Sequence, residues 1–193
     1  LDYLDFWRAC PRCGAAFGFL QCDHCTPLAN KGERVRPCVS ALRYTADTGV
    51  LIKTYKDKGE QRLSETLAAI LANTLPPSWM TWANGVTYVS ASNAARRRRG
   101  FDHIELLTRS LADQCGLPCI RTLNPPATRD QRILGKTERK QNMQGRFTAC
   151  EPLPGRRLLL IDDVFTTGAT MDQAGIALEL AGARVRCATV ARV

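Results

Sequence analysis

One short segment of the sequence places two acids beside a turn of small, hydroxyl-bearing residues. Four apolar residues, 158–161, precede Asp162 and Asp163, and after two spacer residues comes the run Thr166-Thr167-Gly168-Ala169-Thr170. The apolar run predicts a buried strand, so the acids would emerge at its carboxyl end, where α/β sheets bind ligands. Backbone N–H groups of the turn could bind a phosphate at the start of a helix. The acids could accept hydrogen bonds from sugar hydroxyls, which predicts a site for a ribose phosphate.

A plainer interpretation of this segment is a capped helix start with exposed acids. Ser, Thr and Asp are common at helix N-caps for purely local reasons. A lone Thr-Thr-Gly would favour that interpretation. The combination of apolar strand, acid pair, two spacers and small turn favours the ligand site instead.

Two Cys-x-x-Cys pairs near the N-terminus predict a metal site. Cys10 and Cys13 form the first pair, and Cys22 and Cys25 form the second. Four thiolates complete a tetrahedron around Zn²⁺ and leave no open position for catalysis, so we expect a structural zinc. Two redox pairs are the alternative, but the thioredoxin-like setting is missing. The other cysteines are expected to be buried structural thiols: Cys38, Cys115, Cys119, Cys150 and Cys187.

Arg96, Arg97, Arg98 and Arg99 form a run of like charge. Clustered arginines can bind pyrophosphate or a nucleic-acid backbone, and such contacts give affinity without sequence preference. Most charge runs, however, are simply a solvated face. Few aromatic residues lie near the run, so a base-stacking platform is not indicated. Both interpretations stay open.

Alternating strand and helix patterns predict the elements that would position these residues. Strands are expected at 40–44, 85–92, 118–123, 157–161 and 185–193. Helices are expected at 48–55, 63–73, 101–115 and 170–181. This alternation predicts a mostly parallel sheet covered on both faces. Residues 124–145 lack an apolar period, and so long a loop is usually functional or disordered.

Composition sets further limits. The formal charge of +9, or about +7 with a zinc bound to four thiolates, favours polyanionic partners. Residues 1–10 lack the basic and apolar blocks of a signal peptide. The uncharged stretch 66–95 is broken by prolines and asparagines, so no membrane span is expected. We expect a cytoplasmic protein, with a zinc-ribbon module and link at 1–38 and an α/β domain at 39–193.

The segment 158–171 resembles the motif of type I phosphoribosyltransferases that binds 5-phosphoribosyl-1-pyrophosphate (PRPP). The resemblance implies a type I phosphoribosyltransferase-like α/β fold, with a mostly parallel sheet flanked by helices. It also implies that Asp162 and Asp163 bind the ribose hydroxyls and that Thr166 to Thr170 bind the 5′-phosphate. Mg²⁺ would accompany the pyrophosphate.

From Cys10 to about residue 190, the chain resembles the ComF family of competence proteins, which are phosphoribosyltransferase-like and tied to DNA uptake. Besides the cysteine pairs, the resemblance rests on 41–60, RRRGFDH at 97–103, and Thr128, Gln131, Leu134, Arg139, Asn142 and Phe147. The family's Val-Pro-x-Pro turn is replaced here by Val-Ser-Ala-Ser at 89–92, and its RGFNQ by RGFDH. Ser90, Ala91 and Arg139 are the resulting pyrophosphate-side candidates.

The resemblance leaves three functions to compare. The first is an Mg-dependent phosphoribosyltransferase, in which metal and basic side chains neutralise the leaving pyrophosphate and Arg139 or Lys140 closes over it. No residue indicates an acceptor base. The second is a non-catalytic module that responds to PRPP or a nucleotide and holds single-stranded DNA, with DNA-uptake proteins as partners. The third is a scaffold that acts only through its zinc ribbon. PRPP binding would argue against it, because a scaffold has no use for a PRPP site.

Overall fold

The computed structural model describes residues 10, 13, 14, 22, 25, 35–126 and 146–193, and every structural statement below concerns these residues. Its sheet has four strands in the order β1-β4-β3-β2, and all neighbouring strands run parallel. The strands are β1 (Cys38–Arg43), β2 (Gly85–Tyr88), β3 (Arg157–Phe165) and β4 (Arg184–Arg192). The mostly parallel sheet that the sequence predicts is therefore confirmed.

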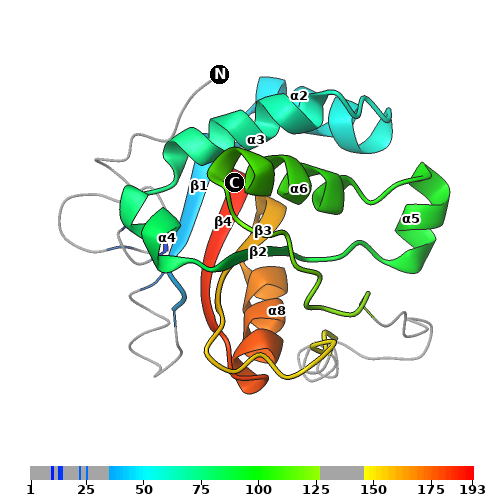
Figure 1. Ribbon diagram of the computed structural model, residues 1–193. Coiled ribbons are helices and arrows are strands. Elements are labelled where there is room, and N and C mark those ends of the chain that lie inside the picture. The colour runs from blue at the N-terminus through cyan, green and yellow to red at the C-terminus, as the bar shows by residue number, and fades with distance from the viewer. Residues whose placement is uncertain (1–9, 11–12, 15–21, 23–24, 26–34, 127–145) are drawn as a thin grey trace.

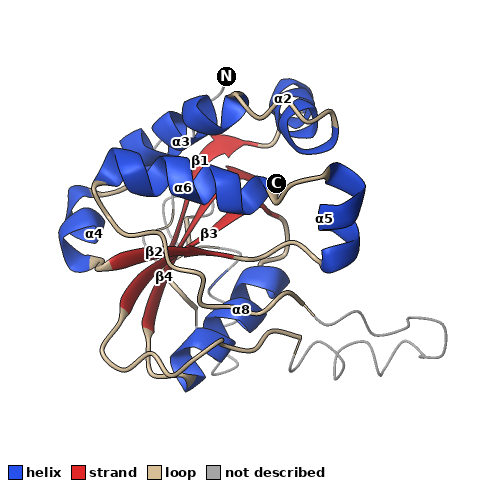
Figure 2. Ribbon diagram, turned by 45° about the vertical axis from the view of Figure 1, so that its right-hand side comes forward, coloured by secondary structure: helices blue, strands red, loops and turns tan. Residues whose placement is uncertain are grey.

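Helices cover both faces of this sheet (Figure 1, Figure 2). On one side lie α2 (Ala46–Asp57), α3 (Leu63–Thr74) and α6 (His103–Cys115), and on the other lies α8 (Ala169–Leu180). Two short helices, α4 (Pro77–Trp82) and α5 (Asn93–Arg99), flank β2 in the chain. None of the helices described is both long and apolar enough to cross a membrane.

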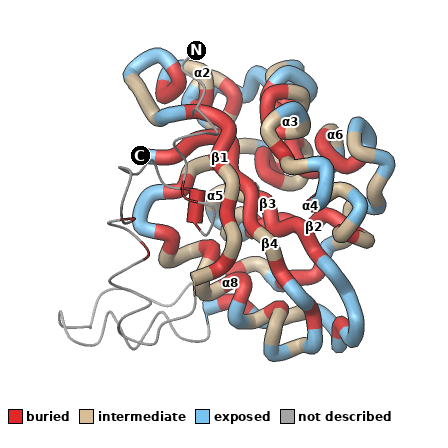
Figure 3. Tube along the Cα trace, turned by 90° about the vertical axis from the view of Figure 1, so that its left-hand side faces the viewer, coloured by how far each residue is buried: buried red, intermediate tan, exposed pale blue. Residues whose placement is uncertain are grey.

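The strand β3 is buried on both faces, because successive side chains of a strand point in opposite directions. Leu159 and Ile161 pack in the cluster that α3 and α6 complete. Leu158 and Leu160 pack in the second cluster, with Leu178 of α8. Figure 3 shows the buried residues concentrated along the strands. This burial fixes the position of the acids that follow.

The strand continues four residues beyond its predicted end at position 161. Parallel pairing with β4 persists through both acids, with Asp162 opposite Thr189 and Phe165 opposite Arg192. The strand can carry Asp163 here because polar side chains from two neighbouring helices bind it. The final strand and the helix 169–180 lie within one residue of their predicted starts and ends.

Local capping explains where α6 begins and ends. The side chain of Asp102 accepts hydrogen bonds from the N–H groups of Ile104 and Glu105, so the helix starts at His103 rather than at the predicted position 101. Gly116 closes it with φ of 63°, as the sequence predicts. The same logic applies at the start of α2, where Thr45 and Thr48 form a capping box.

Three predicted elements differ from the structure. Strand 85–92 ends at Tyr88, because Ser92 caps the unpredicted helix α5. Strand 118–123 is reduced to two isolated bridges, Val86 with Cys119 and Leu123 with Ala149. The double proline does end α3, but Pro77 is also the first residue of α4, a position where its missing N–H is harmless.

Some predictions concern residues outside the described part of the chain. Most of the loop at 124–145 falls there, and with it Arg139 and Lys140, the residues expected to close over a ligand.

Candidate functional site

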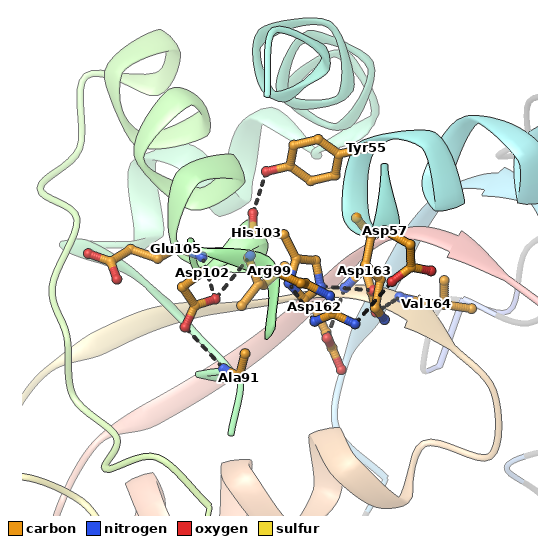
Figure 4. Close-up of polar contacts among 12 residues, drawn as sticks. Tyr55, Asp57, Ala91, Arg99, Asp102, His103, Glu105, Asp162, Asp163 and Val164 are labelled. Atoms are coloured by element: carbon orange, nitrogen blue, oxygen red, sulfur yellow. Dashed lines mark hydrogen bonds and ion pairs between the residues drawn. The ribbon is translucent and has the colours of Figure 1, made fainter. Parts of the chain in front are cut away.

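Asp163 of β3 meets basic side chains from two helices, and Figure 4 shows one of them, His103, beside it. Asp163 is buried, and its Oδ2 accepts hydrogen bonds from Lys56 Nζ at 2.6 Å and from His103 Nε2 at 3.1 Å. Its Oδ1 accepts the N–H of Val164 at 2.8 Å. Asp162 is less buried, and its Oδ1 accepts the N–H of Asp163 at 2.9 Å. Both carboxylates are thus positioned before any ligand arrives.

His103 also connects Asp163 to a wider network of polar side chains. Nη1 of Arg99 lies 3.5 Å from its Nδ1, and Nη2 donates to Asp57 at 3.2 Å. A guanidinium can only donate, so Nδ1 is the acceptor and Nε2 carries the hydrogen given to Asp163. The hydroxyl of Tyr55 donates to the backbone carbonyl of His103 and fixes the start of α6.

The two acids have opposite electrostatic environments. Burial would raise the pKa of Asp163, but its hydrogen bond from His103 and the charge of Lys56 outweigh burial and hold that pKa below its ordinary range. Burial, reinforced by the charge of Asp163, raises the pKa of Asp162 well above the ordinary range. Asp163 is therefore an ionised, partnered carboxylate. Asp162 is the one that gains most from a nearby cation or donor.

The turn after β3 leads into the N-terminus of α8. Thr166 and Thr167 are exposed, and α8 begins directly afterwards at Ala169. Gly168 has φ of 79°, and a Cβ placed there would lie 2.5 Å from Cζ of Phe165. Both facts require glycine. Thr167 Oγ1 accepts the N–H of Ala169 at 3.4 Å, and Thr170 lies in the first turn of α8, whose N–H groups can bind an anion.

The loop after β2 lies beside the acid pair. The N–H of Val89 bonds to the carbonyl of Ile161 at 3.1 Å, and Ser90 is buried. The N–H of Ala91 donates to Asp102 at 3.1 Å, so the acid that caps α6 also holds this loop. Here an acid stands where the ComF pattern has an amide. The pyrophosphate-side role of Ser90 and Ala91 stays a prediction.

The four side chains of the arginine run point in two directions, two toward the protein and two toward solvent. Arg99 is paired inward with His103 and Asp57, and Nε of Arg96 lies 3.9 Å from Asp102. Arg97 and Arg98 are exposed on α5, which stands out from the sheet. Any contact with nucleic acid would therefore use the outer pair, and that role also stays a prediction.

The four cysteines near the N-terminus come together as predicted. Their sulfurs all lie within 4.8 Å of one another, and all four residues are buried (Cys10, Cys13, Cys22 and Cys25). Burial and the neighbouring thiols raise the pKa of Cys25 to about 11, so a cation is needed to favour the thiolate form. A buried cluster of four sulfurs is the donor set that holds a metal ion such as Zn²⁺.

Sequence reasoning found the acids, the turn and the cysteines but gave no role to Lys56 or His103. Lys56 lies in the stretch 41–60 and His103 in the RGFDH motif, so both were inside segments that resemble ComF proteins. The missing information was spatial: these residues lie 107 and 60 positions before Asp163.

These features together define the class of the protein. A parallel sheet flanked by helices carries an acid pair at a strand end, followed by a Thr-Thr-Gly turn into a helix. This is a phosphoribosyltransferase-like fold, and a cysteine cluster that could hold a metal lies at its N-terminal side.

Sequence comparison identifies relatives of this chain. No protein-family model matches the chain. It is 27% identical to the DNA utilization protein YhgH of Salmonella typhimurium, covering 84% of this chain and 74% of the relative. It is 24% identical to Competence protein F of Haemophilus influenzae, covering 85% and 75%. The resemblance to ComF proteins is thus confirmed.

Solved structures with a similar fold include two phosphoribosyl enzymes. Orotate phosphoribosyltransferase from Aeropyrum pernix is 14% identical, with a TM-score of 0.41 and coverage of 74% of this chain and 76% of that one. The PRPP amidotransferase from B. subtilis is 18% identical, with a TM-score of 0.45 and coverage of 67% of this chain. This chain spans about a quarter of the amidotransferase's length.

Proposed function

We propose that the chain binds PRPP together with Mg²⁺ at the carboxyl end of β3, and that it serves DNA uptake. One observation carries the proposal: Asp162 and Asp163 precede the Thr166–Thr170 turn by only two residues, and Lys56 pairs with Asp163. The names of the relatives, DNA utilization protein and competence protein, support the biological role.

Each part of the site matches one part of PRPP. The two carboxylates accept hydrogen bonds from the ribose hydroxyls, and the turn with the first N–H groups of α8 binds the 5′-phosphate. Gly168 lets the backbone of the turn pack directly on the Phe165 ring, which sets the position of the N–H groups proposed to bind the phosphate. The resemblance to phosphoribosyltransferases implies that the loop at 89–92 would face the pyrophosphate.

The charges at the site explain why Mg²⁺ belongs to the proposal. Within the described residues, Lys56 and Arg99 bring two positive charges, whereas Asp57, Asp162 and Asp163 bring three negative ones. A pyrophosphate beside this set would meet net repulsion. Mg²⁺, bound through one or two carboxylates and substrate phosphates, would remove it. Asp162, whose pKa is raised by burial, gains most from such a cation.

The geometry supports ligand binding more directly than turnover. A general base needs a free lone pair directed at the acceptor. In His103, Nε2 donates to Asp163 and Nδ1 faces Arg99, so neither nitrogen serves an acceptor in this arrangement. The exposed Arg97 and Arg98 favour the second candidate function, in which PRPP regulates a module that holds single-stranded DNA.

Calorimetric titration of PRPP with Mg²⁺ into the zinc-loaded protein tests the proposal. We expect saturable binding that Asp162→Asn abolishes or weakens by at least about a hundredfold, as loss of a charge-assisted hydrogen bond and a metal ligand would predict. Glu151→Gln, an exposed acid elsewhere on the chain, is the matched control and should bind normally. Absence of binding by well-folded wild-type protein would refute the site.

A pyrophosphate-release assay with candidate acceptors separates the two functions. Release that depends on an acceptor supports a phosphoribosyltransferase. PRPP binding without release, combined with DNA affinity, supports the regulated binding module.

A further inference from the structure

Arg192 touches both the cysteine cluster and the end of β3. It is the last residue of β4 and lies opposite Phe165 in the parallel register. Its side chain is buried, and Nη1 donates to the backbone carbonyl of Cys13 at 2.9 Å. Its guanidinium carbon lies 3.9 Å from the centre of the Phe165 ring. One side chain thus connects a metal-ligand segment to the strand that carries the acid pair.

The ring of Phe165 lies directly beneath the Thr166–Thr170 turn. Three atoms of its ring lie between 2.5 and 3.2 Å from where a Cβ of Gly168 would stand. The backbone at Gly168 therefore rests on the ring with no room for a side chain. Displacement of the ring would move the backbone N–H groups that are proposed to bind phosphate.

The segment that follows the cysteines contacts α8, the helix that begins after the Thr166–Thr170 turn. Arg36 is buried, and it pairs with Asp172 at 2.8 Å and with Glu179 at 2.9 Å, both on α8. Gly175 gives it room, because a Cβ there would lie 2.5 Å from its Nε. Helix α8, which begins at the Thr166–Thr170 turn, is thus bound to the segment that follows the four cysteines.

The backbone of the cluster is also packed closely against the sheet. A Cβ at Gly14 would lie 2.2 Å from the carbonyl oxygen of Cys38, the first residue of β1. Gly14 directly follows Cys13, so this contact and the bond from Arg192 hold the same short piece of chain. A metal that holds the cysteines would therefore also hold this piece of chain against the residues that support the turn.

We propose that Arg192 is a positioning residue that couples the four-cysteine metal site to the Thr166–Thr170 turn. The cluster holds the Cys13 carbonyl in place, the carbonyl and the Phe165 ring hold the guanidinium, and the ring supports Gly168. A buried guanidinium is costly unless its donors and its charge find partners, so loss of either partner would disturb the other. The description of the turn as a phosphate site rests on the proposed function, whereas the coupling itself concerns only this chain's contacts.

Hydrogen exchange of the zinc-loaded full chain tests the coupling without any ligand. In Arg192→Met, we expect amide exchange at 166–169 to accelerate about tenfold, as loss of one desolvated cation–π contact would predict, while zinc content stays unchanged. The matched control is Arg186→Met. Arg186 lies on the same strand and stacks on Trp79 and Trp82, with its guanidinium carbon 5.2 and 4.2 Å from their ring centres. It should leave exchange at the turn unchanged.

If the methionine variants do not fold, Arg192→Lys and Arg186→Lys allow the same comparison with more conservative changes. A lysine keeps the charge but has no planar fork to stack on Phe165 and reach Cys13 together, so exchange at the turn should rise by less than in Arg192→Met. Unchanged exchange in the Arg192 variants, or equal acceleration in the Arg186 variants, would overturn the proposal.

Reciprocity supplies a second readout, because coupling between two sites acts in both directions. PRPP with Mg²⁺ should slow the removal of Zn²⁺ by a chelator in the wild-type protein, and Arg192→Met should lose this protection. If the wild-type protein binds no PRPP, the proposed function fails, and the exchange experiment still decides the coupling. If PRPP binds but exchange at the turn is independent of Arg192, the coupling fails and the proposed function stands.

Discussion

Asp162 and Asp163 are neighbours in sequence, yet their surroundings give them different tasks. Asp163 is ionised and bound by Lys56 and His103, so it orders the site before ligand binding. Burial and the charge of its neighbour raise the pKa of Asp162, so its ionised form is less favoured than that of Asp163 when no ligand is present. A carboxylate that is destabilised without a ligand and stabilised by Mg²⁺ or a sugar hydroxyl is a residue maintained for binding rather than for folding.

Asp162→Asn is therefore expected to stabilise the ligand-free protein while it weakens PRPP binding. The folded state favours protonated Asp162, so the acid destabilises the fold as pH rises above the ordinary aspartate range. Removing it should add about 0.5–2 kcal/mol to the free energy of unfolding at pH 7. Denaturant unfolding at pH 7 and at about pH 3 measures this, and the gain should vanish at the lower pH, where both states are protonated.

Asp163→Asn is the contrasting variant. It leaves Lys56 and His103 without their carboxylate and should lower the free energy of unfolding by about 1–3 kcal/mol, less if Lys56 turns to solvent. Equal stability changes in the two variants would contradict the assignment of separate roles.

Lys56→Met should make the protein more sensitive to acid. The pKa of Asp163 is depressed, so this group stabilises the fold above the ordinary value of about 3.8, and the stabilisation is lost as pH falls below it. Without Lys56 that pKa moves upward, so unfolding should begin at a higher pH. Circular dichroism along a pH titration measures the midpoint. Lys53→Met, an exposed lysine one turn earlier on α2, should leave the midpoint in place.

At the scale of elements, the turn between β3 and α8 depends on glycine for two separate reasons. Its φ of 79° is unfavourable for other residues, and the Phe165 ring occupies the space where a side chain would begin. Gly155 also has a positive φ, of 72°, but nothing lies within 4 Å of its Cβ position. A substitution at Gly155 therefore tests backbone strain alone, whereas one at Gly168 tests strain together with the contact to the ring.

Gly168→Ala should cost clearly more stability than Gly155→Ala. Backbone strain alone predicts about 1–2 kcal/mol for either variant, and the contact with Phe165 adds about 1–3 kcal/mol at position 168. Thermal unfolding of both variants measures the difference. Similar costs at the two positions would show that the Phe165 ring moves aside easily, which would also weaken its role as a support of the turn.

The elements show how far sequence reasoning reaches. Strand β3 and the capped end of α6 at Gly116 were predictable, because apolar runs and helix stops are local signals. Helix α5 was not, since it has no apolar stripe and is defined by the Ser92 cap and by Gly100. The roles of Lys56 and His103 were not predictable either, because they arise only when α2 and α6 pack beside β3. Long-range polar pairs leave no periodic signal in a single sequence.

At the scale of the whole molecule, exposed arginine pairs lie toward both ends of strand β3. The acid pair and the turn lie at the carboxyl end of β3, and α5 carries Arg97 and Arg98 outward from the loop after β2. At the amino end of the same strand, Arg156 and Arg157 are also adjacent and exposed. The two arginine pairs have the same charge and differ in position, which allows the nucleic-acid proposal to be tested by location.

Replacement of both Arg97 and Arg98 by alanine should weaken binding of single-stranded DNA and reduce its dependence on salt. Each phosphate contact to a single strand contributes about 0.7 to the slope of log K against log salt, so loss of two contacts should lower the slope by about 1.4. Fluorescence anisotropy with a labelled oligonucleotide across a salt series measures this slope. Arg156→Ala with Arg157→Ala removes the same charge at the opposite end of the strand. If that pair lowers affinity and slope equally, the positive charge acts as a general field over the protein, and α5 is not the DNA-binding surface. A selective loss in the α5 variant would place the DNA beside the proposed PRPP site, where a bound ligand could influence it through Arg99 and His103.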